Sequence, residues 1–234
     1  MKKKDLNCYR FILGLILLSV TGNLFSQQEA EIVTKNYKFN DGVYFSFSDF
    51  KENQPVLRWE EVQGNLFSNP EAFTVKAETL KQKTLGPSAE NLLDSIWGFS
   101  IGGIPYIKIE KKKEDLLTLF SGMRVRGQLS YFSYEIREER DISFSAINPY
   151  TAKPFRRTVE KRNLKFKKEK ILLFSTGEIM DYSYENMEIL MKSDPTLLRA
   201  LYQIEDYELE EKMFKCLLIY NDRHVVKTTA TTPN

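Results

Sequence analysis

The chain has 234 residues and nearly balanced charge, with 34 basic and 32 acidic side chains and a formal net charge of +2. This balance gives no sign of a nucleic-acid binder, and a 13 % aromatic content argues against disorder and favours strands. The length is enough for one good-sized domain or two small ones, with a substantial core.

The N-terminus predicts a secretory signal peptide over residues 1–26. A basic segment precedes an apolar run at 11–20, which is too short for a transmembrane helix of about 20 residues. We expect cleavage after Ser26; the alternative is an uncleaved anchor. Cys8 precedes the apolar run, so we expect no lipid anchor, and no later stretch approaches membrane-spanning length. The basic residues of the leader are Lys2, Lys3, Lys4 and Arg10.

Removal of this leader changes the balance of the protein. It takes away four basic residues and one acidic residue, which leaves 30 against 31 and a net charge near −1. Only Cys216 then remains, so no intramolecular disulfide can form. We expect Cys216 to be a small buried apolar residue; the alternatives are a reactive thiol or an intermolecular bridge.

After a loose leader at 27–36, a β-rich body is predicted over residues 37–182. A strand at 42–47 is rich in β formers, and Ser48 follows as the N-cap of a short helical turn. Gly102-Gly103 stands between two β-rich runs and predicts a two-residue hairpin turn.

The second half of the body continues the β pattern. A strand pattern at 123–136 has a bend at Gly127-Gln128, and a short strand is expected at 142–147. A turn lies between Asn148 and Pro154. Residues 155–168 are strongly basic and predict one hairpin, and residues 171–182 predict another.

The period changes from 2 to 3.6 in the C-terminal helical region, 183–226. Ser183 caps a first helix, Asp194-Pro195 starts a second, and a longest helix runs from Glu205 to about Asn221. Residues 227–234 read as a flexible polar tail. Strands followed by helices predict an α+β fold, with a mainly antiparallel β body and two or three C-terminal helices packed on it.

Several segments carry a family resemblance. The run from Gly42 to Pro55 (GVYFSFSDFKENQP) resembles the start of uncharacterised exported proteins of Bacteroidota, which follow G-x-Y-x-S/T-F-x-D-F-x-x-N-x-P. The runs Trp97-Gly-Phe99, Glu185-Asn-Met-Glu188 with Asp194-Pro195, and Tyr220-Asn-Asp-Arg-His224 are similar to theirs too. The resemblance implies a Gram-negative envelope or secreted location, and it gives no information about activity or catalytic residues.

The strongest surface signal is basic. Nine basic and two acidic residues lie between Lys153 and Lys170, interleaved with apolar residues. The functional interpretation is a contact for anionic envelope material, such as lipid head groups or acidic glycans. The alternatives are a solvated hairpin, or one docked on the acidic segment Glu205–Glu211 of the same molecule. The candidate binding residues are Arg156, Arg157, Lys161, Arg162, Lys165, Lys167 and Lys168.

Catalytic motifs are absent from the sequence. His224 is the only histidine, and its place after the longest helix suits a residue that satisfies helix carbonyls. We expect no metal site and no cofactor. The leading hypothesis is a non-enzymatic binding or assembly protein of the cell envelope or secreted fraction. Its partner would be an envelope protein, an anionic glycan or a lipid surface, and not a nucleic acid. The alternative is a hydrolase of envelope or host polymers, acting through a carboxylate pair that sequence cannot identify.

Overall fold

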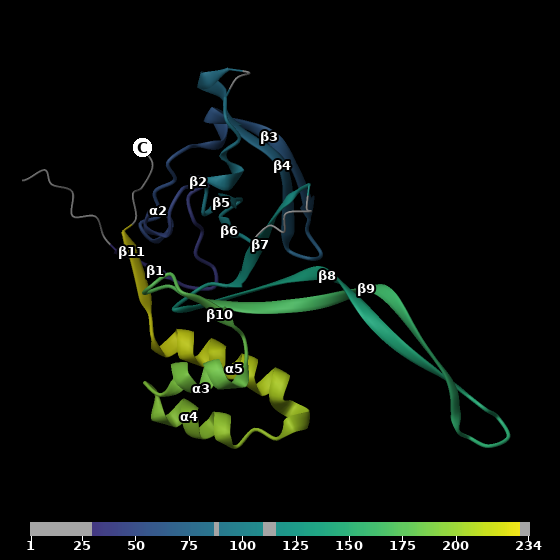
Figure 1. Cartoon of the computed structure of the whole chain (residues 1–234). Coiled ribbons are helices and arrows are strands. Elements are labelled where there is room, and N and C mark those ends of the chain that lie inside the picture. Colours follow the sequence, from purple (N-terminus) through teal and green to yellow (C-terminus); the bar gives the residue numbers. More distant parts are fainter. Residues whose placement is uncertain (1–29, 87–88, 110–115, 230–234) are drawn as a thin grey trace, which may run out of the picture.

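The computed structural model describes residues 30–86, 89–109 and 116–229. The expected signal peptide at 1–26 lies outside these residues. Within them, an antiparallel sheet forms the body and three helices follow it at the C-terminal end (Figure 1). The expectation of an α+β fold with a β body and C-terminal helices is confirmed.

The main sheet has nine described strands. Their order is β10-β9-β8-β7-β6-β5-β2, and β4 also pairs with β7 and carries β3 at its other edge. All pairings are antiparallel. The strands are β2 (Gly42–Tyr44), β3 (Val62–Asn69), β4 (Thr74–Gln82), β5 (Gly98–Ile101), β6 (Ile104–Lys108), β7 (Thr118–Val125), β8 (Leu129–Ile147), β9 (Pro154–Leu173) and β10 (Ile179–Asp181).

The two ends of the described chain form a separate two-stranded sheet. β1 (Ala30–Val33) pairs with β11 (Val226–Thr229). We expected a loose leader at 27–36 and a flexible tail from 227. The structure corrects this expectation for residues 30–33 and 227–229, which lie in paired strands. Both segments hold β-branched side chains, but neither has a local partner, so the pairing arises only when the fold brings the ends together.

A short helix, α2 (Phe47–Lys51), follows β2. Its N-cap is Ser46, not the predicted Ser48, and the strand ends at Tyr44 rather than at residue 47. The Asp49 N–H donates to Ser46 Oγ (3.2 Å), and the Ser46 N–H donates to Asp49 Oδ2 (2.8 Å). This reciprocal capping box fixes the start of the helix two residues earlier than the strand propensities indicate.

Most of the predicted turns are found, but the sequence analysis assigned the two strands of one long hairpin to two separate elements. Gly102-Gly103 joins β5 to β6 with positive φ at both residues, and the bend at 127–128 separates β7 from β8. The expected short strand at 142–147 and hairpin within 155–168 are instead the two sides of one long hairpin. β8 pairs with β9 over almost its whole length, with the turn between Asn148 and Pro154.

The helical region agrees with its predicted caps. Ser183 caps α3 (Tyr184–Met191), and Asp194 caps α4 (Pro195–Tyr202). The last helix, α5 (Leu209–Arg223), starts later than expected because a 3-10 turn occupies 206–208. None of the described helices has the length and apolar character needed to cross a membrane.

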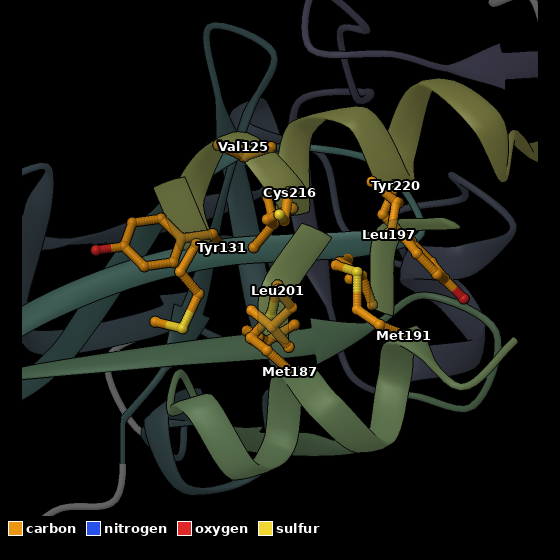
Figure 2. Close-up of a cluster of buried hydrophobic side chains, with 12 residues drawn as sticks. Val125, Tyr131, Met187, Met191, Leu197, Leu201, Cys216 and Tyr220 are labelled. Carbon is orange, nitrogen blue, oxygen red and sulfur yellow. The ribbon is translucent and has the colours of Figure 1, made fainter. Parts of the chain in front are cut away.

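The base of the β8–β9 hairpin lies between two cores. One face of the hairpin packs on the helices, where Tyr131 shares a core with side chains such as Leu201 and Cys216 (Figure 2). The opposite face packs Phe132 and other residues against the aromatic side chains around α2. This burial on both faces holds the base of the hairpin firmly in the body.

Asp194 links α4 to α5 by an ion pair. Its carboxylate accepts the Thr196 and Leu197 N–H groups and binds the Arg223 guanidinium at 2.8 Å. The hydrogen bond from Arg223 and the backbone N–H groups lower the pKa of the Asp194 carboxyl below its usual value.

A lowered pKa in the folded state gives stability that is present above the unfolded pKa of about 4 and is lost as pH falls through the folded pKa. We expect Asp194→Asn, which keeps an N-cap side chain, to melt below wild type at neutral pH, with the difference narrowing under acid. Melting temperatures measured across pH, with Asp222→Asn as the exposed control, check this. A difference that stays constant with pH would contradict it.

Candidate functional site

The long hairpin leaves the body and projects away from it (Figure 1). We call residues 134–168 the hairpin arm, with a tip at 142–159 and a stem formed by the remaining residues. At about 3.3 Å per residue, the thirteen steps from Tyr134 to Ile147 give a reach of about 40 Å. Most side chains of the arm are exposed, so the fold presents this element to its surroundings.

The predicted basic residues do not form one surface. Side chains alternate between the two faces of a strand, so neighbours in β9 point in opposite directions. Three of the seven candidates share the face of Phe166, and four lie on the other face. The first group is Arg156, Arg162 and Lys168, and the second is Arg157, Lys161, Lys165 and Lys167.

Stem cations are compensated by acidic residues. Lys161 pairs with Glu139 at 3.4 Å and Lys165 with Glu135 at 3.7 Å, both across the two strands. Lys167 pairs with Glu169 at 2.7 Å, and Arg162 with Glu160 at 3.0 Å. These exposed pairs add little stability, but they neutralise much of the charge that the sequence analysis assigned to a binding patch.

Two arginines in the stem lie directly opposite each other. Arg140 faces Arg162 in the register, an arrangement of like charges that is unfavourable. Their guanidinium groups extend in opposite directions along the strands. Arg140 covers the Phe166 ring at 4.1 Å, and Arg162 covers the Phe144 ring at 4.6 Å. The cation–π contacts separate the two charges and partly cover one apolar face of the arm.

The tip has a different composition. Residues 142–159 contain three cations and no acidic residue. Large apolar side chains stand exposed beside these cations: Ile147 is 62 % exposed, Val159 58 % and Tyr150 96 %. The tip cations are Lys153, Arg156 and Arg157. No ion pair involves any of them within the described part of the chain.

Hydrogen bonds order the loop at the end of the tip. The Asn148 N–H donates to the Lys153 carbonyl, and the Ala152 N–H donates to the Asn148 carbonyl, both at 2.9 Å. Asn148 Oδ1 also accepts the Tyr150 N–H at 2.9 Å. Ala152 takes a φ of 52°, which lets the chain turn back. The loop therefore has a defined shape that leaves Tyr150 exposed.

A cleft of about 430 Å³ lies at the base of the arm, where the stem approaches the start of α5. Of the predicted basic residues, only Lys167 borders it, and Glu210 and Glu211 of α5 border it too. The alternative in which the whole basic hairpin docks on the acidic segment 205–211 is therefore limited to Lys167 at this cleft. The lining residues are Tyr131, Lys167, Glu169, Tyr182, Tyr207, Glu210, Glu211 and Phe214.

Two carboxyl groups of this cleft, those of Glu169 and Glu211, have lowered pKa values. Burial would raise the pKa of Glu169, but hydrogen bonds from Lys167 and Tyr131 outweigh burial and lower that pKa. The Lys215 side chain lowers the pKa of Glu211. Burial raises the pKa of Tyr182, whose hydroxyl has no hydrogen-bond partner among the described atoms. A general acid of a glycosidase needs a raised carboxyl pKa, and neither shifted carboxyl here has one.

His224 and Cys216, which the sequence analysis also considered, have surroundings that indicate structural roles. His224 lies at the end of α5, where its ring stacks on Tyr220 and its Nδ1 lies 3.1 Å from the Tyr220 carbonyl oxygen, as predicted for a helix terminus. Cys216 is buried in the helical core, as expected, and burial raises the pKa of its thiol. Among the described residues, no group of three His, Cys, Asp or Glu side chains could hold a metal ion.

The comparisons with known proteins found no matching family model, no similar curated protein and no similar solved structure. The candidate site therefore depends on geometry and composition. The sequence analysis did not include Ile147, Tyr150 and Lys153 among its candidate residues, because it selected the segment with the highest density of basic residues. The signal that could have found them is the acid-free run at 142–159, which differs from the mixed charges on both sides of it.

Proposed function

We propose that this is a non-enzymatic binding or assembly protein of the cell envelope or secreted fraction, and that the hairpin arm is its binding element. The observation that carries the proposal is the arm itself. Two strands of 19 and 20 residues start from a base that is buried on both faces, and their residues 134–168 project into solvent. No element needs an extension of this length to complete a core, because none of the three core clusters contains a tip residue.

The charge of the arm favours an anionic partner. Residues 134–168 hold ten basic and five acidic side chains, a net charge of +5. The acids are confined to the stem, so the excess is greatest where the arm is farthest from the body. Long-range attraction of this kind steers a binding element toward negative surfaces. Export by the leader at 1–26 would place the arm in contact with anionic envelope material.

The cleft at the base of the arm is the place where a hydrolase would be sought. Carboxylates from β9 and α5 do meet there, as the alternative hypothesis requires. Glu169 and Glu211 are each held in ion pairs, with Lys167 and Lys215 respectively. Ion-paired anions suit the positioning of side chains better than proton donation, and this favours the binding role over catalysis.

Shortening the arm tests the proposal. Asp141 and Lys161 are direct partners in the register, so an Asn-Gly turn can join them in place of residues 142–160. We expect the full chain, produced in a Gram-negative host, to be retained by the envelope fraction and the shortened chain to be released. The N-terminus of the recovered protein, expected at or near Gln27, tests export in the same samples.

The shortened chain should keep the wild-type unfolding transition, because it leaves all three cores intact. Should it fail to fold, Arg156→Glu combined with Arg157→Glu changes the net charge of the tip from +3 to −1 without a deletion. Equal retention of wild type and of either folded variant would exclude the arm as the binding element.

A further inference from the structure

We propose that the tip of the arm binds the surface of an anionic phospholipid bilayer, with its apolar side chains entering the headgroup region. This inference rests on the proposed function and names the partner of the same arm. The two parts of the arm differ in what they can contact. Ion pairs engage five of the seven cations of the stem, whereas the tip at 142–159 has three cations, no acid and several exposed apolar side chains.

The combination of side chains at the tip points to lipid. Ile147 and Val159 are aliphatic and more than half exposed. Neither can form a hydrogen bond to a glycan or stack on a sugar ring. At a bilayer surface, such side chains leave water for the acyl boundary while neighbouring cations meet lipid phosphates. Tyr150 is amphipathic and belongs to the residue types that gather at membrane–water interfaces.

The distribution of apolar and basic side chains around the tip indicates how the arm would approach a bilayer. The cations Arg156 and Arg157 point to opposite faces of the hairpin. Ile147 and Phe144 also occupy opposite faces, and Tyr150 lies in the loop between the strands. A ribbon lying flat on a bilayer would use one face only. Apolar and basic groups on both faces fit an arm that meets the bilayer end-on.

The length of the arm is consistent with this approach. A reach of about 40 Å lets the tip touch a planar surface while the body remains clear of it. The loop is already ordered by hydrogen bonds between Asn148, Ala152 and Lys153, so binding would not have to order it at an entropic cost.

Vesicle co-sedimentation tests the inference. The chain from Gln27 onward is suitable because the described elements, with all three cores, lie within it. We expect binding to phosphatidylcholine vesicles that contain about a third phosphatidylglycerol, and little binding to phosphatidylcholine alone. Changing all three tip cations to Gln should weaken binding about a hundredfold, since each contributes about a fivefold gain near an anionic surface.

A matched variant controls for total charge. Lys161→Gln, Lys165→Gln and Lys167→Gln remove the same three charges from the stem. Lys161 is four residues from Arg157, about 13 Å along the strand and beyond the Debye length of about 8 Å. We therefore expect this variant to bind within a few fold of wild type. An equal loss from the stem and tip variants would overturn the assignment to the tip.

Apolar variants test entry into the bilayer. Ile147→Ser with Tyr150→Ser should weaken binding by about tenfold or more at unchanged charge. Leu85→Ser with Ile189→Ser, at exposed apolar positions away from the arm, should not. An unchanged affinity of the tip variant would reduce the contact to electrostatic adsorption and overturn the proposed insertion.

The two proposals fail in different ways. Absence of vesicle binding by the wild type, together with arm-dependent retention by the envelope fraction, would overturn the lipid partner and leave the arm as a binding element for another partner. Retention of the shortened chain by the envelope would overturn the proposed function, whatever the vesicles show.

Discussion

Replacing Asn53 with alanine is expected to lower the free energy of unfolding by about 4 kcal/mol. Asn53 is buried and takes a φ of 54°, two residues after the end of α2. Its Oδ1 accepts the Asn40 N–H (2.7 Å) and the Tyr44 hydroxyl (3.2 Å), and its Nδ2 donates to the Tyr37 hydroxyl (2.9 Å). Three lost hydrogen bonds cost about 1 kcal/mol each, and alanine in the left-handed region adds about another.

The conformational and hydrogen-bonding parts can be separated by a second variant. Asn53→Gly also removes the three hydrogen bonds, but glycine adopts positive φ without strain, so it should be about 1 kcal/mol less damaging than alanine. Gln54→Ala, at the exposed neighbour, is the matched control. Urea unfolding with an unchanged m value measures each difference. A loss below about 0.5 kcal/mol for Asn53→Ala, typical of surface changes, would refute the role of this network.

Asn53 belongs to the sequence motif at 42–55, and the structure gives that motif a physical explanation. Ser46 and Asp49 form the capping box of α2, and Tyr44 is buried beside Asn53. A Cβ on Gly42 would lie 2.4 Å from the Leu57 carbonyl oxygen. Phe47 and Phe50 belong to the aromatic cluster that covers the base of the arm. These motif residues hold the strand-to-helix junction between β2 and α2.

Features with local causes could be predicted from the sequence. Ser183 and Asp194-Pro195 mark helix starts because caps act through backbone groups two or three residues away. The Gly102-Gly103 turn and the change to helical period after residue 182 are equally local. The capping error at α2 has a local cause too, since Ser46 and Ser48 both suit an N-cap and only the position of Asp49 decides between them.

Features that depend on distant partners could not be predicted. β1 and β11 lie at opposite ends of the described chain. The length of the arm was missed because residues 142–147 and 155–168 each look like a complete short element. Their pairing across the 148–153 turn shows only in the register. For the candidate site, the sequence shows the charge and the acid-free run at 142–159, but only the structure shows the cross-strand ion pairs that compensate cations of the stem.

A second large effect is expected where the helices meet the base of the arm. Asn221 of α5 pairs with the backbone of Leu129 in the manner of a neighbouring strand. The Leu129 N–H donates to Asn221 Oδ1 (2.7 Å), and Asn221 Nδ2 donates to the Leu129 carbonyl (2.9 Å). Gly127 permits this close approach, because a Cβ there would lie 2.7 Å from Asn221 Cγ.

We expect Asn221→Ala to lower the free energy of unfolding by about 3 kcal/mol, since it leaves a backbone donor and acceptor at the buried Leu129 without partners. Alanine has a higher helix propensity than asparagine. Helix propensity alone would therefore stabilise Asn221→Ala, and it cannot explain a lowered free energy of unfolding. Asp222→Ala, one residue further on an exposed part of α5, controls for that propensity. Hydrogen exchange gives a local measurement, because the Leu129 amide should lose protection in Asn221→Ala and keep it in Asp222→Ala. Unchanged protection would show that packing of the helical core, rather than Asn221, attaches α5 to the base of the arm.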